Sequence, residues 1–463
     1  MSVRPPDPIF VEGADVETSN GEIDKIKKDI ERIFETYEPK YLKTIDKTMK
    51  RYLGKEHWLL NKLRQKYVRK REKESSRVVR SRTNVHVDRS DSNVASTYGY
   101  FGYDANDPSE DDVVCATSML NKGIAHLFAV IDGHGGRICV EFIKASLAET
   151  IFGRLGVAEA PSEIERELKL ALQDIDTAFM EHVSEEVKRH VDGPPRRKRS
   201  RRAYATGSKR GPLRAIHAGA CVVVALIYDN AVYVANAGDC RAILAHHIAA
   251  AGERTTNALD VEQLSHDHKC ADASEARDVA NRCPSDLRAI RRTRDDRSDY
   301  DPRLPLRVAG SLAITRAIGD AYLKRANCSY PPFAAHVPYL ACPCVAEITR
   351  RPLSSKTATF LVLASDGFWD NLSNRETAER LSDSTTRDVT LSKIAKELTM
   401  ESLRRASNAC GLSVRNIKSL KRGTPRRCYH DDITVLVVDV QRALLVRGET
   451  EDDDEESSSG AKV

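Results

Sequence analysis

The run CVVVALIYDNAVYVANAGD, residues 221–239, contains two short apolar segments with only Asp229 and Asn230 between them. Both segments are rich in β-branched residues, which is typical of sheet strands. Two-residue connections of this kind close β-hairpins, since Asp and Asn tolerate the backbone angles of tight turns, although Ala231 stands where a glycine is usual. We therefore predict a hairpin that leaves Asp239 at the rim of a sheet.

Similar apolar runs recur along the chain, and segments with helical spacing lie between them. The strand-like runs are LFAVI (127–131), TFLVLAS (359–365) and ITVLVVDV (433–440). Strands grouped among pairs of helices predict an α+β domain with helices outside antiparallel sheets. The helical segments are ICVEFIKASLAETIF after Gly136, a segment capped by Ser162 and Glu165, a segment opened by Ser373 and Glu376, and LSKIAKELTMESLRRA.

The composition allows one large domain with extensions, or two domains, within the 463 residues. Hydrophobic residues make up 41% and charged residues 30%, enough for a sizeable core inside a well-solvated surface. The eleven cysteines form no C-x-x-C pair, so we expect reduced thiols and no disulfide framework. The N-terminal residues lack a targeting pattern, and no apolar run approaches the ~18 residues that cross a bilayer. We predict a cytoplasmic and/or nuclear protein that does not enter a membrane.

Composition divides the chain into a main body and several additions. We predict a disordered N-terminus over 1–20, a helical extension over 21–75, and a large main domain over 96–445. A basic flexible insertion is predicted at 184–215, and an acidic disordered tail at 446–463. The extension could pack on the main body, inhibit it or dock a partner. Its irregular apolar stripes form no sustained heptad, which favours packing.

The insertion carries the basic run 195–202, for which three interpretations stay open. The run could be a solvated loop, a nuclear-import signal or a nucleic-acid contact. Basic clusters of this kind serve nuclear import. Stacking on nucleic acid needs interleaved aromatic residues, which the run lacks. We therefore expect no nucleic-acid partner.

Acidic residues recur where the predicted strands start, stop or turn. A carboxylate at the rim of a sheet is held by stiff backbone, and several converging rims gather oxygens into one cluster. Like charges repel unless a cation neutralises them, and hard ions such as Mg²⁺ or Mn²⁺ prefer oxygen ligands. Asp and Gly also suit ordinary turns, so the pattern alone leaves a metal cluster and a set of turns as alternatives. The residues are Glu110, Asp111, Asp112, Asp132, Asp239, Asp320, Asp366, Asp370, Asp431 and Asp432.

Six runs follow one another along the chain: FAVIDGHGG (128–136), VANAGDCRAIL (234–244), LSHDHK (264–269), SLAITRAIGDAYLK (311–324), LVLASDGFWDNLS (361–373) and HDDITVLVVDV (430–440). Their order is that of the metal-dependent type 2C serine/threonine protein phosphatases, which the chain resembles over residues 96–445 apart from the insertion. The resemblance implies two packed antiparallel β-sheets flanked by helices, and two or possibly three Mg²⁺ or Mn²⁺ ions. It also implies hydrolysis of phosphoserine and phosphothreonine in proteins by a water that two metals activate. The runs DAYLK and YLACPCV are most similar to the pyruvate dehydrogenase phosphatases and their plant relatives.

The resemblance also assigns ligands to the two catalytic ions. Asp132 would bridge both ions. The Gly133 carbonyl and Glu110 would complete the ligands of one ion, while Asp366 and Asp431 would hold the other. All of these donors are oxygen atoms, as Mg²⁺ and Mn²⁺ require.

Further roles follow from the same resemblance. Asp239 and Asp370 would join Asp366 at a weaker third metal site, and Asp111 would act through water. His134 matches the general acid that protonates the leaving Ser or Thr oxygen. An imidazole suits that role because its pKa lies near neutral pH.

Three residues depart from the family pattern. Many members carry an arginine that binds substrate phosphate four residues before the glutamate, whereas this chain has Asn106. We therefore expect the metals or another cation to hold the phosphate. Asp432 stands where asparagine is usual and adds a charge beside a predicted ligand. Cys240 replaces a common serine, which raises the hypothesis that oxidation affects the site.

A catalytically inert pseudophosphatase, acting as a binding or regulatory module, is the competing interpretation. Such chains lose metal-binding carboxylates, whereas this chain keeps every carboxylate that the resemblance assigns. The sequence therefore favours an enzyme. Its expected partners are phosphoprotein substrates, and we expect the chain to be a monomer.

Overall fold

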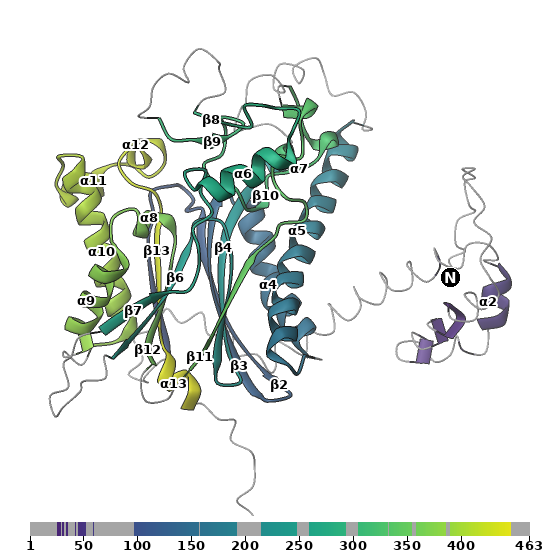
Figure 1. Cartoon of the computed structure of the whole chain (residues 1–463), viewed down its shortest axis with the longest axis horizontal. Helices are drawn as coiled ribbons and strands as arrows, with labels where there is room; N and C mark the ends of the chain where they lie inside the picture. Colours follow the sequence, from purple (N-terminus) through teal and green to yellow (C-terminus); the bar gives the residue numbers. More distant parts are fainter. Residues whose placement is uncertain are drawn as a thin grey trace, which may run out of the picture. The chain divides into compact units, whose positions relative to one another are not determined.

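The structure is a computed structural model of the whole chain, and it separates into two compact units, Met1–Arg89 and Ser90–Val463. Each unit is described by itself (Figure 1). The described residues are 97–156, 158–191, 214–247, 259–292, 304–331, 333–353, 358–385 and 389–445, together with 26–28, 30, 31, 34, 35, 42, 45–51 and 59.

The larger unit contains a five-stranded sheet in which every neighbouring pair is antiparallel. β1 and β13 are far apart in the sequence but adjacent in this sheet, so the two ends of the domain are joined through hydrogen bonds. In order across the sheet, the strands are β1 (Tyr98–Tyr103), β13 (Ile433–Asp439), β12 (Ala358–Ala364), β6 (Arg241–His247) and β7 (Leu259–Gln263).

The second sheet contains the predicted hairpin, which is confirmed. Asp229 and Asn230 take positive φ angles of 50° and 53°, as a tight two-residue turn requires. Ala231 already belongs to the following strand, so no glycine is needed there. In order across the sheet, the strands are β11 (Glu347–Pro352), β5 (Ala231–Ala237), β4 (Gly219–Tyr228), β3 (Gly123–His134) and β2 (Asp111–Leu120), and β10 (Ile318–Gly319) pairs with β4. A separate two-stranded pair joins β8 (Ile290–Arg291) and β9 (Arg307–Val308).

Helices cover the outer face of each sheet (Figure 1). The second sheet is covered by α4 (Ile138–Leu155) and α5 (Pro161–Val191). The first sheet is covered by α9 (Asn374–Thr385) and α10 (Leu391–Ala409). The shorter helices are α6 (Ala273–Arg282), α7 (Ala321–Lys324), α8 (Asp366–Trp369), α11 (Val414–Ser419), α12 (Thr424–Arg427) and α13 (Val440–Leu445), with 3₁₀ turns η2 (Arg214–His217), η3 (Ala326–Cys328) and η4 (Phe333–Ala335).

Strand β3 shows why the sequence of the inner strands is apolar without interruption. Successive side chains of a strand point to opposite faces. Leu127 and Ile131 pack toward the outer helices, whereas Phe128 and Val130 pack toward the other sheet. Both faces are therefore buried, and the predicted α+β fold of two packed antiparallel sheets flanked by helices is confirmed.

Two helix boundaries differ from the prediction. Ser162 does not cap α5, because the helix begins at Pro161 and the Glu163 carboxylate accepts the preceding N–H groups of Glu159 and Ala160 at 2.9 and 3.1 Å. The same helix continues to Val191, so the predicted insertion cannot begin at 184. Residues 192–213, with the basic run, lie outside the described residues.

The Ser373 and Glu376 capping box is confirmed at the start of α9. The backbone N–H of Ser373 donates to Glu376 Oε2 at 2.9 Å, and the N–H of Glu376 donates to Ser373 Oγ at 3.3 Å. This exchange satisfies N–H groups that a helix start leaves without intrahelical partners. It fixes the segment that follows α8.

The smaller unit contains α2 (Ile45–Arg51) and further helical residues in the predicted extension. An apolar cluster holds these residues together, and Lys27 pairs with Asp46 at 2.6 Å. Residues 1–20 and 446–463, predicted to be disordered, lie outside the described residues. Among the described helices, none has the length and apolar character that a membrane span requires. The cluster consists of Ile26, Ile30, Phe34, Ile45, Met49 and Leu59, with Leu42 against it.

Candidate metal centre

Three of the predicted ligands meet at one end of the β-sandwich. Asp132 lies near the end of β3, Asp239 follows β5, and Asp366 begins α8 directly after β12. One carboxylate oxygen from each lies within 4.8 Å of the others, and the backbone N–H of Asp366 lies 3.4 Å from Asp132 Oδ2. Because β3 and β12 belong to different sheets, the packing of the two sheets brings these carboxylates together.

The cluster has unbalanced negative charge. Burial, followed by the neighbouring charges of Asp366 and Asp111, raises the pKa of Asp132 well above its ordinary value. Burial and the charge of Asp239 likewise raise the pKa of Asp366. Close carboxylates with raised pKa values are a favourable place for a divalent cation, which replaces the protons and neutralises the repulsion. The residues present therefore fit Mg²⁺ or Mn²⁺.

Glu110 and Gly133 lie side by side at the same rim. The N–H of Gly133 donates to the Glu110 carbonyl at 3.0 Å, and the Glu110 carboxylate accepts from the N–H of Gly136 at 2.6 Å. A Cβ atom at Gly133 would lie 2.3 Å from Val140, so only glycine fits this approach. Burial raises the pKa of Glu110. Glu110 is therefore positioned by backbone contacts at the edge of the cluster.

Asp111 lies behind the cluster. It is buried opposite Asp132 in the β2–β3 ladder, and Ser365 Oγ donates to its Oδ2 at 2.7 Å. Burial, with the charge of Asp432, raises the pKa of Asp111 to about 8. The neighbouring carboxylates thus extend the negative field beyond the three that meet directly.

At one margin of the cluster, an arginine contacts two predicted ligands. Arg427, the last residue of α12, places Nη1 2.6 Å from Asp431 Oδ1 and 3.8 Å from Glu110 Oε2. The side chain of Arg427 is 40% exposed, so the pair lies at the mouth of the site. Burial raises the pKa of Asp431, and Arg427 opposes that shift.

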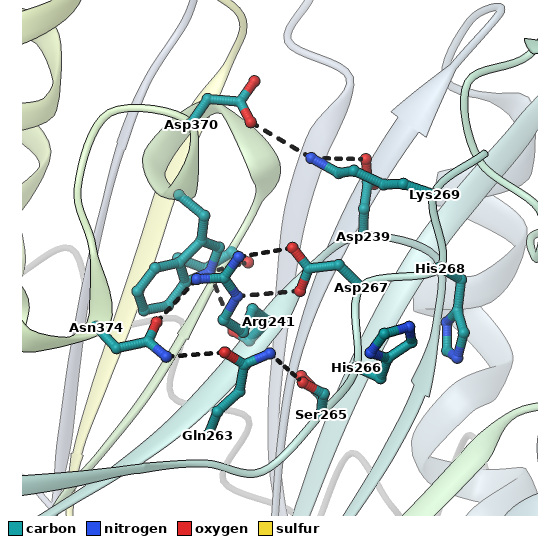
Figure 2. Close-up of polar contacts among 12 residues, drawn as sticks. Asp239, Arg241, Gln263, Ser265, His266, Asp267, His268, Lys269, Asp370 and Asn374 are labelled. Carbon is teal, nitrogen blue, oxygen red and sulfur yellow. Dashed lines mark hydrogen bonds and ion pairs between the residues drawn. The ribbon is translucent and has the colours of Figure 1, made fainter. Parts of the chain in front are cut away.

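At the opposite margin, a lysine occupies the equivalent position. Figure 2 shows Lys269 reaching between Asp239 and Asp370, with Nζ 3.5 Å and 3.4 Å from their carboxylate oxygens. Cys221 Sγ also donates to Asp239 at 3.1 Å. The two residues predicted for a third metal site therefore share a cation supplied by the protein.

A network below Lys269 fixes this margin (Figure 2). The Arg241 guanidinium donates twice to Asp267, at 3.0 and 2.6 Å, and once to Asn374 at 2.8 Å. The same guanidinium lies 5.0 Å from the ring of Trp369 in α8. The loop after β7 is thereby tied to the segment that carries Asp366 and Asp370.

His134 is oriented by Asp320, which the sequence analysis grouped with the strand-end carboxylates but did not connect with His134. Its Nε2 lies 2.9 Å from both carboxylate oxygens of Asp320, whose side chain is fully buried. Burial alone would lower the pKa of His134, but the charge and hydrogen bond of Asp320 outweigh it and raise that pKa. The imidazole itself is 24% exposed, so it combines a fixed orientation with access to solvent.

The two departures Asn106 and Asp432 contact each other. The Asn106 side-chain amide donates to Asp432 Oδ2 at 2.9 Å. Asp432 also accepts backbone N–H groups from Ala105, Asn106 and Glu110 at 2.6, 2.9 and 2.7 Å. The extra carboxylate therefore holds the loop that carries Glu110, and does not add charge to an open site.

The hypothesis that Cys240 makes the site sensitive to oxidation is not supported. Cys240 is fully buried, and burial raises its thiol pKa well above the ordinary value. Oxidants attack the exposed thiolate, which this environment disfavours. All eleven cysteines are free thiols in the structure, consistent with the absence of a disulfide framework.

The structure thus gathers the predicted site residues at one rim, three of them in mutual reach and the others around these three. Sequence reasoning missed the roles of Asp320, Lys269 and Arg427. Arg427 stands four residues before Asp431 but ends α12, so the two side chains meet across the segment that leaves the helix and not within it. Asp320 and Lys269 lie inside quoted runs, but no local spacing links them to His134 or Asp239.

Comparison with known proteins gives a consistent family. A family model described as "Protein phosphatase 2C" matches residues 103–411. "Probable protein phosphatase 2C 25" of Oryza sativa subsp. japonica is 28% identical over 358 residues, covering 76% of this chain and 79% of the relative. "Probable protein phosphatase 2C 61" of the same organism is 33% identical, covering 49% of this chain and 57% of the relative. "Probable protein phosphatase 2C 64" of Arabidopsis thaliana is 28% identical, covering 69% and 70%.

A solved structure is also similar to this chain. It is titled "Structure of a C.elegans sex determining protein" and matches with a TM-score of 0.46 and 17% sequence identity. The match covers 77% of this chain and 68% of that one. None of these names distinguishes a subgroup, so the similarity to pyruvate dehydrogenase phosphatases stays a prediction.

Proposed function

The chain belongs to the protein phosphatase 2C family, and we propose that it hydrolyses phosphoserine and phosphothreonine in other proteins, with Mg²⁺ or Mn²⁺ as cofactor. The observation that carries the proposal is the meeting of Asp132, Asp239 and Asp366 within 4.8 Å at the junction of the two sheets. Structural stability alone gives no reason to bring three like charges so close at a buried or half-buried place, because each costs solvation energy.

The residues that would hold the ions are those that line the rim. Asp132, Asp366 and Asp431 would bind through carboxylates, with Glu110 and the Gly133 carbonyl beside them. Asp239 and Asp370 would serve a third ion. When bound, paired divalent ions supply a water nucleophile at neutral pH and neutralise charge on the phosphoryl oxygens.

His134 would deliver the proton that the leaving oxygen needs. An alkoxide of serine or threonine is a poor leaving group, so protonation during P–O cleavage accelerates the reaction. Asp320 favours the protonated imidazole and fixes its ring. The proton would come from the exposed part of the ring, while Asp320 stabilises the charge before transfer.

The experiment must distinguish an active phosphatase from the alternative, an inert pseudophosphatase. The test is Mn²⁺-dependent release of phosphate from a phosphothreonine peptide by wild type and by Asp366→Asn. We expect hydrolysis by wild type and its loss in the variant. Asp174→Asn is the matched control and should keep full activity, because Asp174 lies on the outer helix α5 and pairs with Arg154 of α4. A folded wild-type protein that binds Mn²⁺ but releases no phosphate would support the inert module.

Localisation is a separate proposal. The basic run 195–202 lies outside the described residues, and its composition alone supports nuclear import. A reporter fused to residues 190–214 should accumulate in the nucleus. A uniform distribution of the reporter through the cell would remove this proposal without affecting the enzymatic one.

A further inference from the structure

We infer that Arg427 binds the phosphate group of the substrate, an inference that rests on the proposed phosphatase function. A phosphate monoester enters the site as a dianion and must be matched by positive charge. In the described part of the chain, only two lysine or arginine side chains lie within 4.0 Å of the carboxylate of a predicted metal ligand, Lys269 and Arg427. The inference selects Arg427 for three independent reasons.

The first reason is the shape of the contact. Both carboxylate contacts of Arg427 are made by Nη1, toward Asp431 and Glu110. The edge formed by Nε and Nη2 takes no part in these contacts. A guanidinium edge donates two parallel hydrogen bonds, which match two oxygens of one phosphate. The ammonium group of Lys269 is a point charge and lacks that geometry.

The second reason is the anchoring of the segment. The neighbouring Arg426 donates to the carbonyls of Asp104, Lys418 and Leu420, at 2.9, 3.1 and 2.6 Å. These bonds fix the short helix α12 against the rest of the domain. The Arg427 side chain is 40% exposed, and among the described residues its ion pairs go to two carboxylates at the site mouth. It can therefore change partners without moving its backbone.

The third reason is that metal ions would occupy the two carboxylates that now contact Arg427. Asp431 and Glu110 are the residues that would hold divalent ions, and a ligand that binds an ion no longer neutralises a guanidinium as well. In the loaded enzyme, Arg427 would lose its present partners beside the reacting centre. An anion with two or three oxygens at that place satisfies the same N–H groups.

The loop opposite Arg427 supplies no competing cation. Position 106 holds an asparagine whose amide donates to Asp432 at 2.9 Å, so this side chain is committed to the loop. Asp432 is adjacent to Asp431, the partner of Arg427. Arg137, which donates to the Ser109 carbonyl of this loop, is itself paired with Asp112 at 2.6 Å. Arg427 is thus the arginine that contacts the predicted ligands at this wall.

The test compares Arg427→Met and Arg427→Lys with wild type at saturating Mn²⁺. Three quantities are measured: KM and kcat for a phosphothreonine peptide, the inhibition constant of inorganic phosphate, and the Mn²⁺ affinity by calorimetry. Arg427→Met should raise KM and the phosphate inhibition constant on the order of tenfold to a hundredfold, the value of a charged hydrogen-bond pair. Arg427→Lys should recover part of the loss, because it restores charge but not the two-pronged geometry.

The control is Arg422→Met. Arg422 lies on the same segment and pairs with the exposed Asp104 at 2.6 Å, so it should leave KM and phosphate inhibition unchanged. Unchanged KM and phosphate inhibition in Arg427→Met, with tighter Mn²⁺ binding alone, would reduce Arg427 to a counter-ion and overturn the inference. If Arg427→Met does not fold, the phosphate inhibition constant of Arg427→Lys is used in its place. A raised constant supports the inference, and an unchanged constant overturns it. Absence of hydrolysis by wild type would instead contradict the proposed function.

Discussion

The two margins of the acidic cluster are built alike but held differently. At one margin Lys269 lies between Asp239 and Asp370, and at the other Arg427 lies between Asp431 and Glu110. The residues next to Lys269 are tied down by backbone bonds, from the N–H of His268 to Gly238 and from Cys270 to Ala313. Arg427 ends a single-turn helix at the site mouth.

This difference indicates that the two cations have different roles, one toward the carboxylates and one toward the substrate. The Lys269 ammonium lies in a braced part of the fold, beside an Asp239 side chain that is only 7% exposed. It is suited to neutralise carboxylates and compete with a third ion. Arg427 is suited to meet an incoming anion, because its carboxylate contacts use only Nη1 and leave the other edge of the guanidinium out of them. The lysine margin should therefore control metal affinity, and the arginine margin substrate affinity.

The largest effect, on kcat, is expected for a substitution of Asp366, which lies between the two margins. Asp366→Asn removes a carboxylate that contributes to both, so kcat should fall on the order of a thousandfold, with loss of Mn²⁺ affinity. Steady-state kinetics and calorimetry on the same preparation measure both quantities. Loss of activity with unchanged Mn²⁺ binding would break the link between the cluster and the ions.

The next largest effect is expected for a substitution in the loop beside the arginine margin, and it concerns the free energy of unfolding. Asp432→Asn turns one acceptor oxygen into an amide that faces N–H donors of the loop 105–110. The free energy of unfolding should fall by about 2 kcal/mol, measured by urea denaturation. Asp439→Asn, at the other end of β13, should cost less than half of that. Equal losses would show that Asp432 has no special role in the loop.

At the lysine margin, we expect a substitution that strengthens Mn²⁺ binding. Lys269→Met removes a cation that competes for Asp239 and Asp370, so the weakest Mn²⁺ site should tighten by about fivefold, the value of one partly buried ion pair. Calorimetric titration measures this change. Lys122→Met, at an exposed pair with Asp229 on the distant hairpin turn, should not alter Mn²⁺ binding. Weaker Mn²⁺ binding in Lys269→Met would show that the lysine supports the ion.

The pH dependence of Mn²⁺ stabilisation should be the smallest effect. Burial and like charges raise the pKa of Asp132 and Asp366, and raise that of Asp111 to about 8. A raised folded pKa means that the ion-free protein loses stability as pH rises above the ordinary carboxylate value toward the folded value. Mn²⁺ removes this penalty, so its thermal shift should be about 2–4 °C larger at pH 8 than at pH 6. A shift that falls with pH contradicts the charge balance.

The sequence predicted the fold well because its strands are buried on both faces. The apolar runs of β3, β4, β5, β12 and β13 coincide with the predicted strands, and the hairpin turn follows from Asp229 and Asn230. The helix boundary at Ser162 was wrong because the helix begins one residue earlier, where Glu163 reaches back to the N–H groups of Glu159 and Ala160. Such competition among neighbouring caps depends on side-chain conformation, which spacing does not specify.

The site was predicted only as far as local patterns reach. Aspartates at strand ends indicated Asp132, Asp239 and Asp366, since sheet rims converge. The pairing of His134 with Asp320 joins residues 186 positions apart and depends on how β10 meets β4. The contact of Asn106 with Asp432 spans 326 positions. No periodicity encodes contacts of that kind, so they emerge only from the packed fold.

The central claim is that the carboxylates at the sheet junction bind paired divalent ions, and calorimetric titration of Mn²⁺ tests it most directly. Wild type at neutral pH should bind about two ions or more per chain, with release of protons, and Asp132→Asn should lose the tightest of them. No measurable heat with the folded wild-type protein, or the same stoichiometry and affinity in Asp132→Asn, would contradict the claim.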